Sequence, residues 1–167
     1  MKIISGGQTG VDRAALDVAL KHGIDAGGSC PTGRLDEFGR IPDCYPLKEL
    51  ENGGFIERTL QNVKDSDGTV IIYPGKLSGG TDQTVRFCIE QRRPCLLIDA
   101  SKTPIKEAAK LIADFVREKQ IDILNVAGPR ESEAPGIYAA ATPFLRAVLD
   151  RVTLRERENL NARRQDI

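Results

Sequence analysis

Short apolar runs alternate with helical patterns along nearly the whole of this 167-residue chain. Strands are expected at these runs, over residues 3–4, 24–29, 69–73, 94–99 and 121–127. Several runs are continuously apolar, which is typical of strands buried on both faces of a parallel sheet. Parallel strands need a long crossover connection, usually a helix. The alternation therefore predicts an α/β fold with a mainly parallel sheet and helices on both faces.

The helices between these strands are read from apolar spacing. Apolar residues at helical intervals, including Ile56 and Val63, predict the buried face of a helix over residues 55–67. The same reasoning places Cys88 and Ile89 on the buried face of the next helix.

The chain shows no internal repeat and no linker. We therefore expect residues 1–150 to form a single ligand-binding domain. Residues 151–167 are charged and sparsely apolar, and we expect a C-terminal extension there. This extension is compatible with a continued helix, an oligomer contact or disorder.

The first strand runs into a glycine-rich corner, Ser5-Gly6-Gly7-Gln8-Thr9-Gly10, which precedes the first helix. Glycine lets backbone approach a ligand closely, and the free N–H groups at a helix N-terminus attract anions. The corner keeps two glycines of the dinucleotide-binding fingerprint, but a serine replaces the first, and no P-loop lysine follows. The sequence predicts a phosphate-binding corner unlike an ordinary NAD or ATP site. The alternative is a turn that only joins strand to helix.

Two further corners follow later strands. Ser78-Gly79-Gly80-Thr81 comes after the third strand, and Gly128-Pro129-Arg130 comes after the fifth. In open α/β sheets, ligands bind beyond the carboxyl ends of the strands where the strand order reverses. Three converging corners predict a site for a small phosphorylated or otherwise anionic ligand.

The candidate ligand-binding residues are drawn from these three corners. Glycine N–H groups and threonine hydroxyls would donate hydrogen bonds to phosphate. Arg13 and Arg130 are the candidate anion partners, although each is equally compatible with a structural salt bridge. Gln8 carries both a donor and an acceptor for a ring edge. The full set is Gly6, Gly7, Gln8, Thr9, Gly10, Arg13, Ser78, Gly79, Gly80, Thr81, Asn125, Gly128 and Arg130.

Residues 30–54 are rich in glycine and proline and have no clear period. A long irregular loop inside a compact domain is usually functional. Arg34 and Arg40 in this loop suggest a lid over an anionic ligand, and a plain surface connection is the equal alternative.

Composition excludes several classes of protein. Lys plus Arg equals Asp plus Glu, at 24 each, so net charge gives no reason to expect a nucleic-acid partner. No apolar run is long enough to cross a membrane, and the first residues lack the features of a signal peptide. The four cysteines lack CxxC spacing, which favours reduced thiols in the cytoplasm. No cluster has metal-ligand spacing, so no metal site is expected.

Four separated motifs carry a resemblance to a known family. SGGQTGVDRAALD, GGSCPTGR, DSDGTVIIY with SGGTDQT, and NVAGPRESEAPGIY together resemble the family of putative molybdenum cofactor carrier proteins. The similarity runs from about residue 3 to residue 149. It implies a Rossmann-like three-layer sandwich, a homo-oligomer, and binding of the molybdenum cofactor (molybdopterin), a pterin with one phosphate. Storage or protection of that cofactor, without catalysis, is the implied role.

The family that this chain resembles belongs to a wider Rossmann-like group. That group includes the Lonely Guy phosphoribohydrolases, whose signature is a PGGxGTxxE turn. The comparable stretch here begins at Ser78 and has Thr84 where the signature has its glutamate. This departure argues against hydrolysis but not against phosphate binding. Two alternatives stay open: a nucleotide or nucleoside-phosphate binding protein, and a phosphoribohydrolase-like enzyme using Asp12, Asp82 or Glu131.

Overall fold

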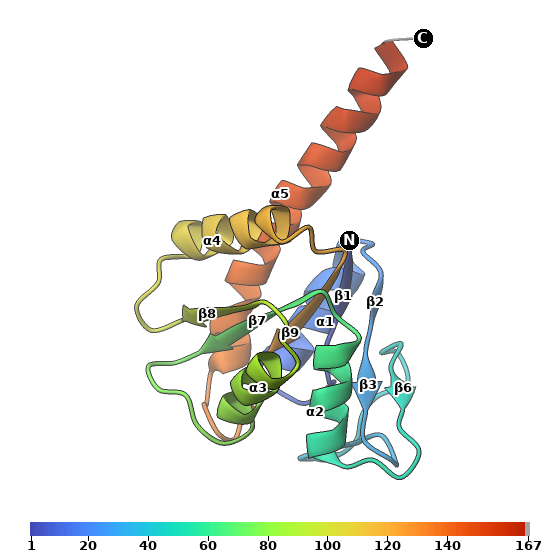
Figure 1. The fold of residues 1–167 in the computed structure, drawn as a ribbon, viewed down its shortest axis with the longest axis vertical. Coiled ribbons are helices and arrows are strands. Elements are labelled where there is room, and N and C mark those ends of the chain that lie inside the picture. Colours follow the sequence, from blue (N-terminus) through green and yellow to red (C-terminus); the bar gives the residue numbers. More distant parts are fainter. Residues whose placement is uncertain (166–167) are drawn as a thin grey trace.

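A five-stranded parallel sheet forms the centre of the molecule (Figure 1). The computed structural model describes the backbone of residues 1–165 and the side chains of residues 1–151. The strand order is β2-β1-β9-β7-β8. The strands are β1 (Lys2–Ile4), β2 (Ala26–Gly27), β7 (Gly68–Tyr73), β8 (Cys95–Asp99) and β9 (Ile123–Ala127). The predicted α/β fold with a parallel sheet is confirmed.

The order of the strands creates the crevice that the fold class uses for ligands. The chain begins at β1, adds β2 on one side, crosses over to place β7 and then β8 on the other, and finally inserts β9 between β1 and β7. Asn125 of β9 is in register with Ile4 on one side and with Thr69 on the other. The carboxyl ends of β1, β9 and β7 therefore lie next to one another, at the point where the strand order reverses.

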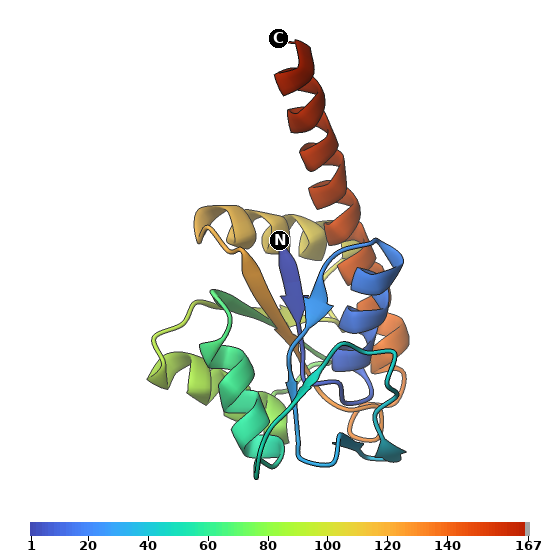
Figure 2. The same cartoon turned by 90° about the vertical axis from the view of Figure 1, so that its right-hand side faces the viewer.

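Helices cover both faces of the sheet (Figure 2). α2 and α3 lie on one face, and α1, α4 and α5 pack together on the other. The main core lies on the α1, α4 and α5 side, where Val70, Ile72 and Val126 are buried. The helices are α1 (Val11–Lys21), α2 (Phe55–Lys64), α3 (Gly79–Glu90), α4 (Ile105–Glu118) and α5 (Ile137–Gln165).

The expected buried faces of α2 and α3 are wrong at two positions. Ile56 is 62% exposed and Ile89 is 72% exposed. α2 instead buries Asn62 beside Val63, and the Asn62 side chain exchanges hydrogen bonds of 2.7 and 3.0 Å with the backbone of Ser29. A polar side chain with its hydrogen-bonding partners satisfied thus belongs to the buried face of α2, for which apolar spacing predicted only hydrophobic residues.

Residues 30–54 are not a structureless loop. β3 (Ser29–Cys30) pairs with β6 (Lys48–Glu49), and β4 (Leu35–Asp36) pairs with β5 (Gly39–Arg40) in a hairpin. Arg34 donates hydrogen bonds to the carbonyl oxygens of Leu47, Pro42 and Tyr45. Arg34, one of the two arginines that suggested a lid, therefore holds its own segment together.

α5 continues from the domain into the charged C-terminal extension, and its last turns project from the body of the molecule (Figures 1 and 2). Residues 166–167 of the predicted extension lie outside the described residues. In the part of the chain that the structure describes, no helix has the length and apolarity needed to cross a bilayer.

Candidate functional site

A cavity of about 270 Å³ lies at the carboxyl ends of β1, β9 and β7. All three predicted corners contribute to its wall, and the first turns of α2 and α3 complete it. The lining residues are Gln8, Phe55, Ile56, Arg58, Thr59, Gly79, Gly80, Thr81, Gln83, Thr84, Ala127, Gly128, Arg130 and Glu133.

The N-terminus of α3 supplies hydrogen-bond donors to this cavity. Ser78 is the N-cap residue, but its hydroxyl makes no capping hydrogen bond. The N–H groups of Thr81 and Asp82 bond to the Ser78 carbonyl oxygen at 3.1 and 3.3 Å. Among the described residues, the N–H groups of Gly79 and Gly80 are left without a partner. The Thr81 side chain is 3% exposed, and its Oγ1 atom also lacks a partner in this part of the chain.

At the first corner, Gly6 makes room for an arginine from α2. Arg58 Nη1 donates to Asp12 Oδ2 at 3.1 Å, and the two side chains are only 12% and 3% exposed. A Cβ atom at Gly6 would lie 1.6 Å from Arg58 Nη1, so only glycine admits the guanidinium here. Burial raises the pKa of Asp12, and the positive charge of Arg58 opposes that rise. The result is a buried cation at the cavity wall, held by one carboxylate.

The β4–β5 hairpin occupies the rest of the first corner. Gln8 Nε2 donates to the Leu35 carbonyl oxygen at 2.8 Å, and Thr9 donates to Glu37. Arg13 forms an ion pair with Asp36 at 2.9 Å and also donates to the Gly7 carbonyl oxygen. Arg13 stacks on the Tyr45 ring at 4.6 Å. The structure therefore places Arg13 in the structural salt bridge that its charge also allowed, outside the cavity.

The third corner packs directly against the first. A Cβ at Gly10 would lie 2.4 Å from the Pro129 carbonyl oxygen, and Gly10 has a φ of +73°, so a larger residue is excluded twice. Glu37 accepts hydrogen bonds from both Thr9 and Ser132. Burial acts to raise the pKa of the Glu37 carboxyl, but the hydrogen bonds from Ser132 and Thr9 together hold that pKa below its ordinary value.

Arg130 reaches the cavity from this third corner. Its guanidinium lies 4.5 Å from the centre of the Phe55 ring, in cation–π geometry. Glu133 also lines the cavity, and its Oε2 atom accepts a hydrogen bond from the Arg130 N–H at 3.2 Å. The cavity rim thus carries one cation and one carboxylate on the same turn.

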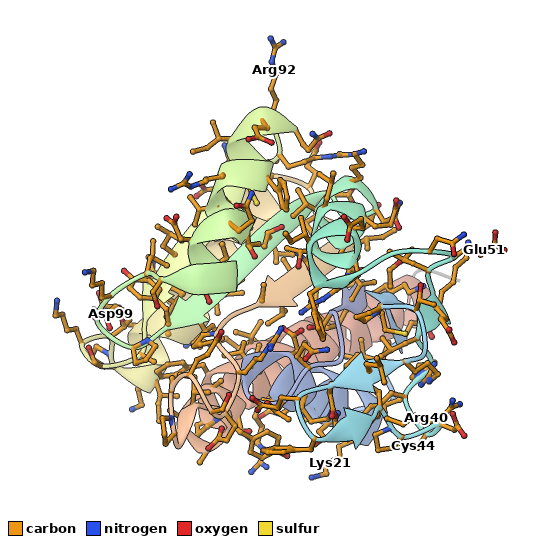
Figure 3. The ribbon with its side chains drawn as sticks, turned by 90° about the horizontal axis from the view of Figure 1, so that it is seen from below. Lys21, Arg40, Cys44, Glu51, Arg92 and Asp99 are labelled. Carbon is orange, nitrogen blue, oxygen red and sulfur yellow. The ribbon has the colours of Figure 1, made fainter. Side chains whose placement is uncertain are left out.

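The sequence-predicted residues fall into two groups. Those that line the cavity are Gln8, Gly79, Gly80, Thr81, Gly128 and Arg130. The others shape its surroundings: they are Gly6, Gly7, Thr9, Gly10, Arg13, Ser78 and Asn125. Asn125 is buried within the sheet, where its Nδ2 donates to Thr69 Oγ1 at 3.2 Å. Arg40, the other arginine that suggested a lid, points outward at the periphery and pairs with Asp43 (Figure 3).

Comparison with known proteins identifies the family. The model of the circularly permutated YpsA SLOG family matches residues 3–149. The chain belongs to this family. A crystal structure of a protein from Syntrophus aciditrophicus SB, named "putative molybdenum carrier protein", is 49% identical, with a TM-score of 0.87. The similarity covers 89% of this chain and 94% of that one. No curated protein matches the chain.

In this family member, sequence reasoning missed the contribution of α2. Phe55, Ile56, Arg58 and Thr59 all belong to its first turns. The signal that could have found them is topological. A crossover helix runs antiparallel to its strands, so its N-terminus lies at the ligand edge of the sheet. Glu133 was missed because it follows a corner of irregular backbone.

Within the described residues, no three His, Cys, Asp or Glu side chains are grouped so that they could hold a metal ion. The four cysteines are free, and Cys30 and Cys88 are buried.

Proposed function

We propose that this protein binds the molybdenum cofactor, a pterin with one phosphate, in the cavity at the carboxyl edge of its sheet. The role would be to store or protect the cofactor rather than to transform it. The name of the 49% identical relative from Syntrophus aciditrophicus supports a carrier role. The proposal also includes self-association. It further includes a cytoplasmic location, because free cysteines are typical of that compartment.

The N-terminus of α3 is the observation that carries this proposal. Free N–H groups at a helix N-terminus and the associated dipole favour a phosphate. Thr81 Oγ1, buried and without a partner in the described chain, is the independent sign that a ligand completes this surface. Arg130 on the facing corner adds positive charge at the rim.

The dimensions of the cavity limit the ligand to a small molecule. Small-molecule sites are typically about 300–1,000 Å³, and the cavity volume of about 270 Å³ lies just below that range. This volume favours one ring system with one phosphate over a dinucleotide. Phe55 and Ile56 give the cavity an apolar wall against which a flat ring can pack.

Three carboxylates that sequence reasoning considered for hydrolysis are engaged elsewhere. Asp12 pairs with Arg58, and Asp82 pairs with the exposed Arg86. Glu131 accepts hydrogen bonds from the N–H groups of Gly136 and Tyr138 at the start of α5. Thr84, at the signature glutamate position, donates to the Gly80 carbonyl oxygen at 2.9 Å. These contacts support binding without catalysis.

One observation favours the phosphoribohydrolase-like alternative. Within the described part of the chain, Glu133 is the one carboxylate that lines the cavity, and it lies beside the α3 N-terminus. A carboxylate there could stabilise positive charge on a ribosyl carbon. Release of free base from a nucleoside monophosphate, followed by chromatography, tests this activity. We expect none.

Anaerobic titration with molybdenum cofactor released from a molybdoenzyme tests the proposal. We expect wild-type protein to bind it, and Thr81→Val to lower the affinity about tenfold by removing one hydrogen bond to the phosphate. Thr142→Val is the matched control, because Thr142 lies on α5 and donates to the Tyr138 carbonyl oxygen. Failure of the wild type to bind the cofactor, with binding of a nucleoside monophosphate instead, would replace the proposal by the nucleotide-binding alternative.

A further inference from the structure

The cavity has a second polar end, away from the α3 N-terminus. Gln8 and Arg58 form it, beside the carboxyl end of β1. β9 lies between β1 and β7 in the sheet. Because neighbouring strands are about 4.8 Å apart, the two ends of the cavity are separated by roughly 10 Å at the level of the sheet.

Gln8 has a fixed orientation at this end. Its Nε2 atom donates to the Leu35 carbonyl oxygen at 2.8 Å. Rotating the amide by 180° would set two carbonyl oxygens against each other, so Oε1 is defined by this contact. Gln8 is 2% exposed, and Oε1 has no hydrogen-bond donor among the described residues. A buried acceptor of this kind requires a partner, which a ligand N–H group would supply.

Arg58 is the complementary donor. Of its five N–H donors, the structure shows one bonded to the protein, through Nη1 to Asp12. Nε is buried and has no acceptor in the described part of the chain. Gly6 lacks the side chain that would displace the guanidinium from this place. The remaining N–H groups of this guanidinium can therefore donate to an acceptor on a ligand in the cavity.

We infer that Gln8 and Arg58 form a second subsite, which reads an N–H donor and an adjacent acceptor on the edge of the ligand's heterocyclic ring. Asp12 is the positioning residue for Arg58. The inference rests on one part of the proposed function, the placement of the ligand's phosphate at the α3 end, and not on the identity of the ring. It specifies a two-ended ligand: a phosphate at one end and a hydrogen-bonding ring edge at the other.

Two kinds of probe separate the subsites. Inorganic phosphate tests the α3 end alone, whereas molybdenum cofactor and guanosine 5′-monophosphate each carry both a phosphate and a ring with a cyclic amide edge. The variants are Gln8→Met and the double variant Asp12→Asn with Arg58→Met, which avoids leaving a buried carboxylate unpaired. Arg86→Met is the control, since Arg86 is exposed on α3 and, among the described residues, pairs with Asp82 alone. Thermal unfolding confirms that each variant is folded.

The expected pattern is specific to the two ends. For whichever two-ended probe binds the wild type, both subsite variants should have an affinity lower by about tenfold or more. Their affinity for inorganic phosphate should be unchanged. Thr81→Val should weaken the binding of both kinds of probe.

Equal affinity of wild type and subsite variants for the two-ended probe would overturn the inference while leaving cofactor binding intact. Loss of phosphate affinity in the variants would also overturn it, by placing Arg58 at the phosphate. If guanosine 5′-monophosphate binds with this pattern and the molybdenum cofactor does not, the inference stands and the proposed function fails. Binding of neither two-ended probe overturns both.

Discussion

Gly6 shows how a single absent side chain shapes the site. Sequence reasoning assigned it a backbone contact with phosphate, but in the structure it admits the Arg58 guanidinium instead. The nearest neighbours of a Cβ at this position are all atoms of that guanidinium group, and no backbone atom is among them. A substitution here should therefore move one flexible side chain rather than the chain fold.

Gly6→Ala should displace Arg58 from Asp12. The buried carboxylate loses its partner, which we expect to lower the free energy of unfolding by roughly 1–3 kcal/mol. Cofactor affinity should fall as in the Arg58 variant. Chemical denaturation and titration measure both effects.

Gly80→Ala is the control for stability, because a Cβ at Gly80 would have no atom of a described residue within 4 Å. We expect it to leave the free energy of unfolding unchanged or slightly higher. A Gly6→Ala protein as stable as wild type, with undiminished affinity, would contradict the role given to Arg58.

At the scale of elements, Asp99 joins the ends of two strands. It lies at the end of β8, accepts a hydrogen bond from the Ser101 hydroxyl at 2.6 Å, and accepts one from the Gly75 N–H beyond β7 at 2.8 Å. The hydrogen bond from the Ser101 hydroxyl, and after it the one from the Gly75 N–H, lower the pKa of Asp99 to about 2. The carboxylate therefore fastens the rim of the sheet only while it is ionised.

The pH dependence follows from this lowered pKa. An unfolded aspartate titrates near about 3.9, so the unfolded chain binds the proton first as the pH falls. The contribution of Asp99 to stability is complete above about pH 4 and is lost toward about pH 2. Asp99→Asn should therefore lose less stability than wild type across this window.

Urea denaturation at several pH values checks this difference. Glu51→Gln, which alters an exposed carboxylate far from Asp99, is the control and should follow the wild type (Figure 3). Parallel pH profiles for wild type and Asp99→Asn would exclude Asp99 as a contributor.

The elements themselves show what a sequence can and cannot predict. Strand and helix positions followed from apolar runs, because burial on both faces leaves a continuous signal at β7 and β9. The helix faces were less predictable: Asn62 is buried through hydrogen bonds to Ser29, which no periodicity reveals. The hairpin of residues 35–40 is too short to show a periodic pattern of apolar residues, so its contacts with Gln8 and Arg13 could not be predicted from the sequence.

At the scale of the whole molecule, the meeting of the three corners at one edge of the sheet could be predicted, but the strand order that separates them could not. Parallel topology brings the carboxyl ends of all the strands to one edge, so Gln8, Thr81 and Arg130 could be linked from sequence. The insertion of β9 between β1 and β7 could not, since strand order depends on packing between distant segments. That insertion sets the separation of the two polar ends of the cavity.

The measurement that tests the central claim most directly is native mass spectrometry of protein purified without oxygen from cells that make molybdenum cofactor. We predict a bound mass that matches the cofactor, with molybdenum confirmed by elemental analysis, on an assembly of two or more chains. The Thr81→Val protein should carry less of it. A bound nucleotide in place of the cofactor, or wild-type protein without any ligand under these conditions, would contradict the account.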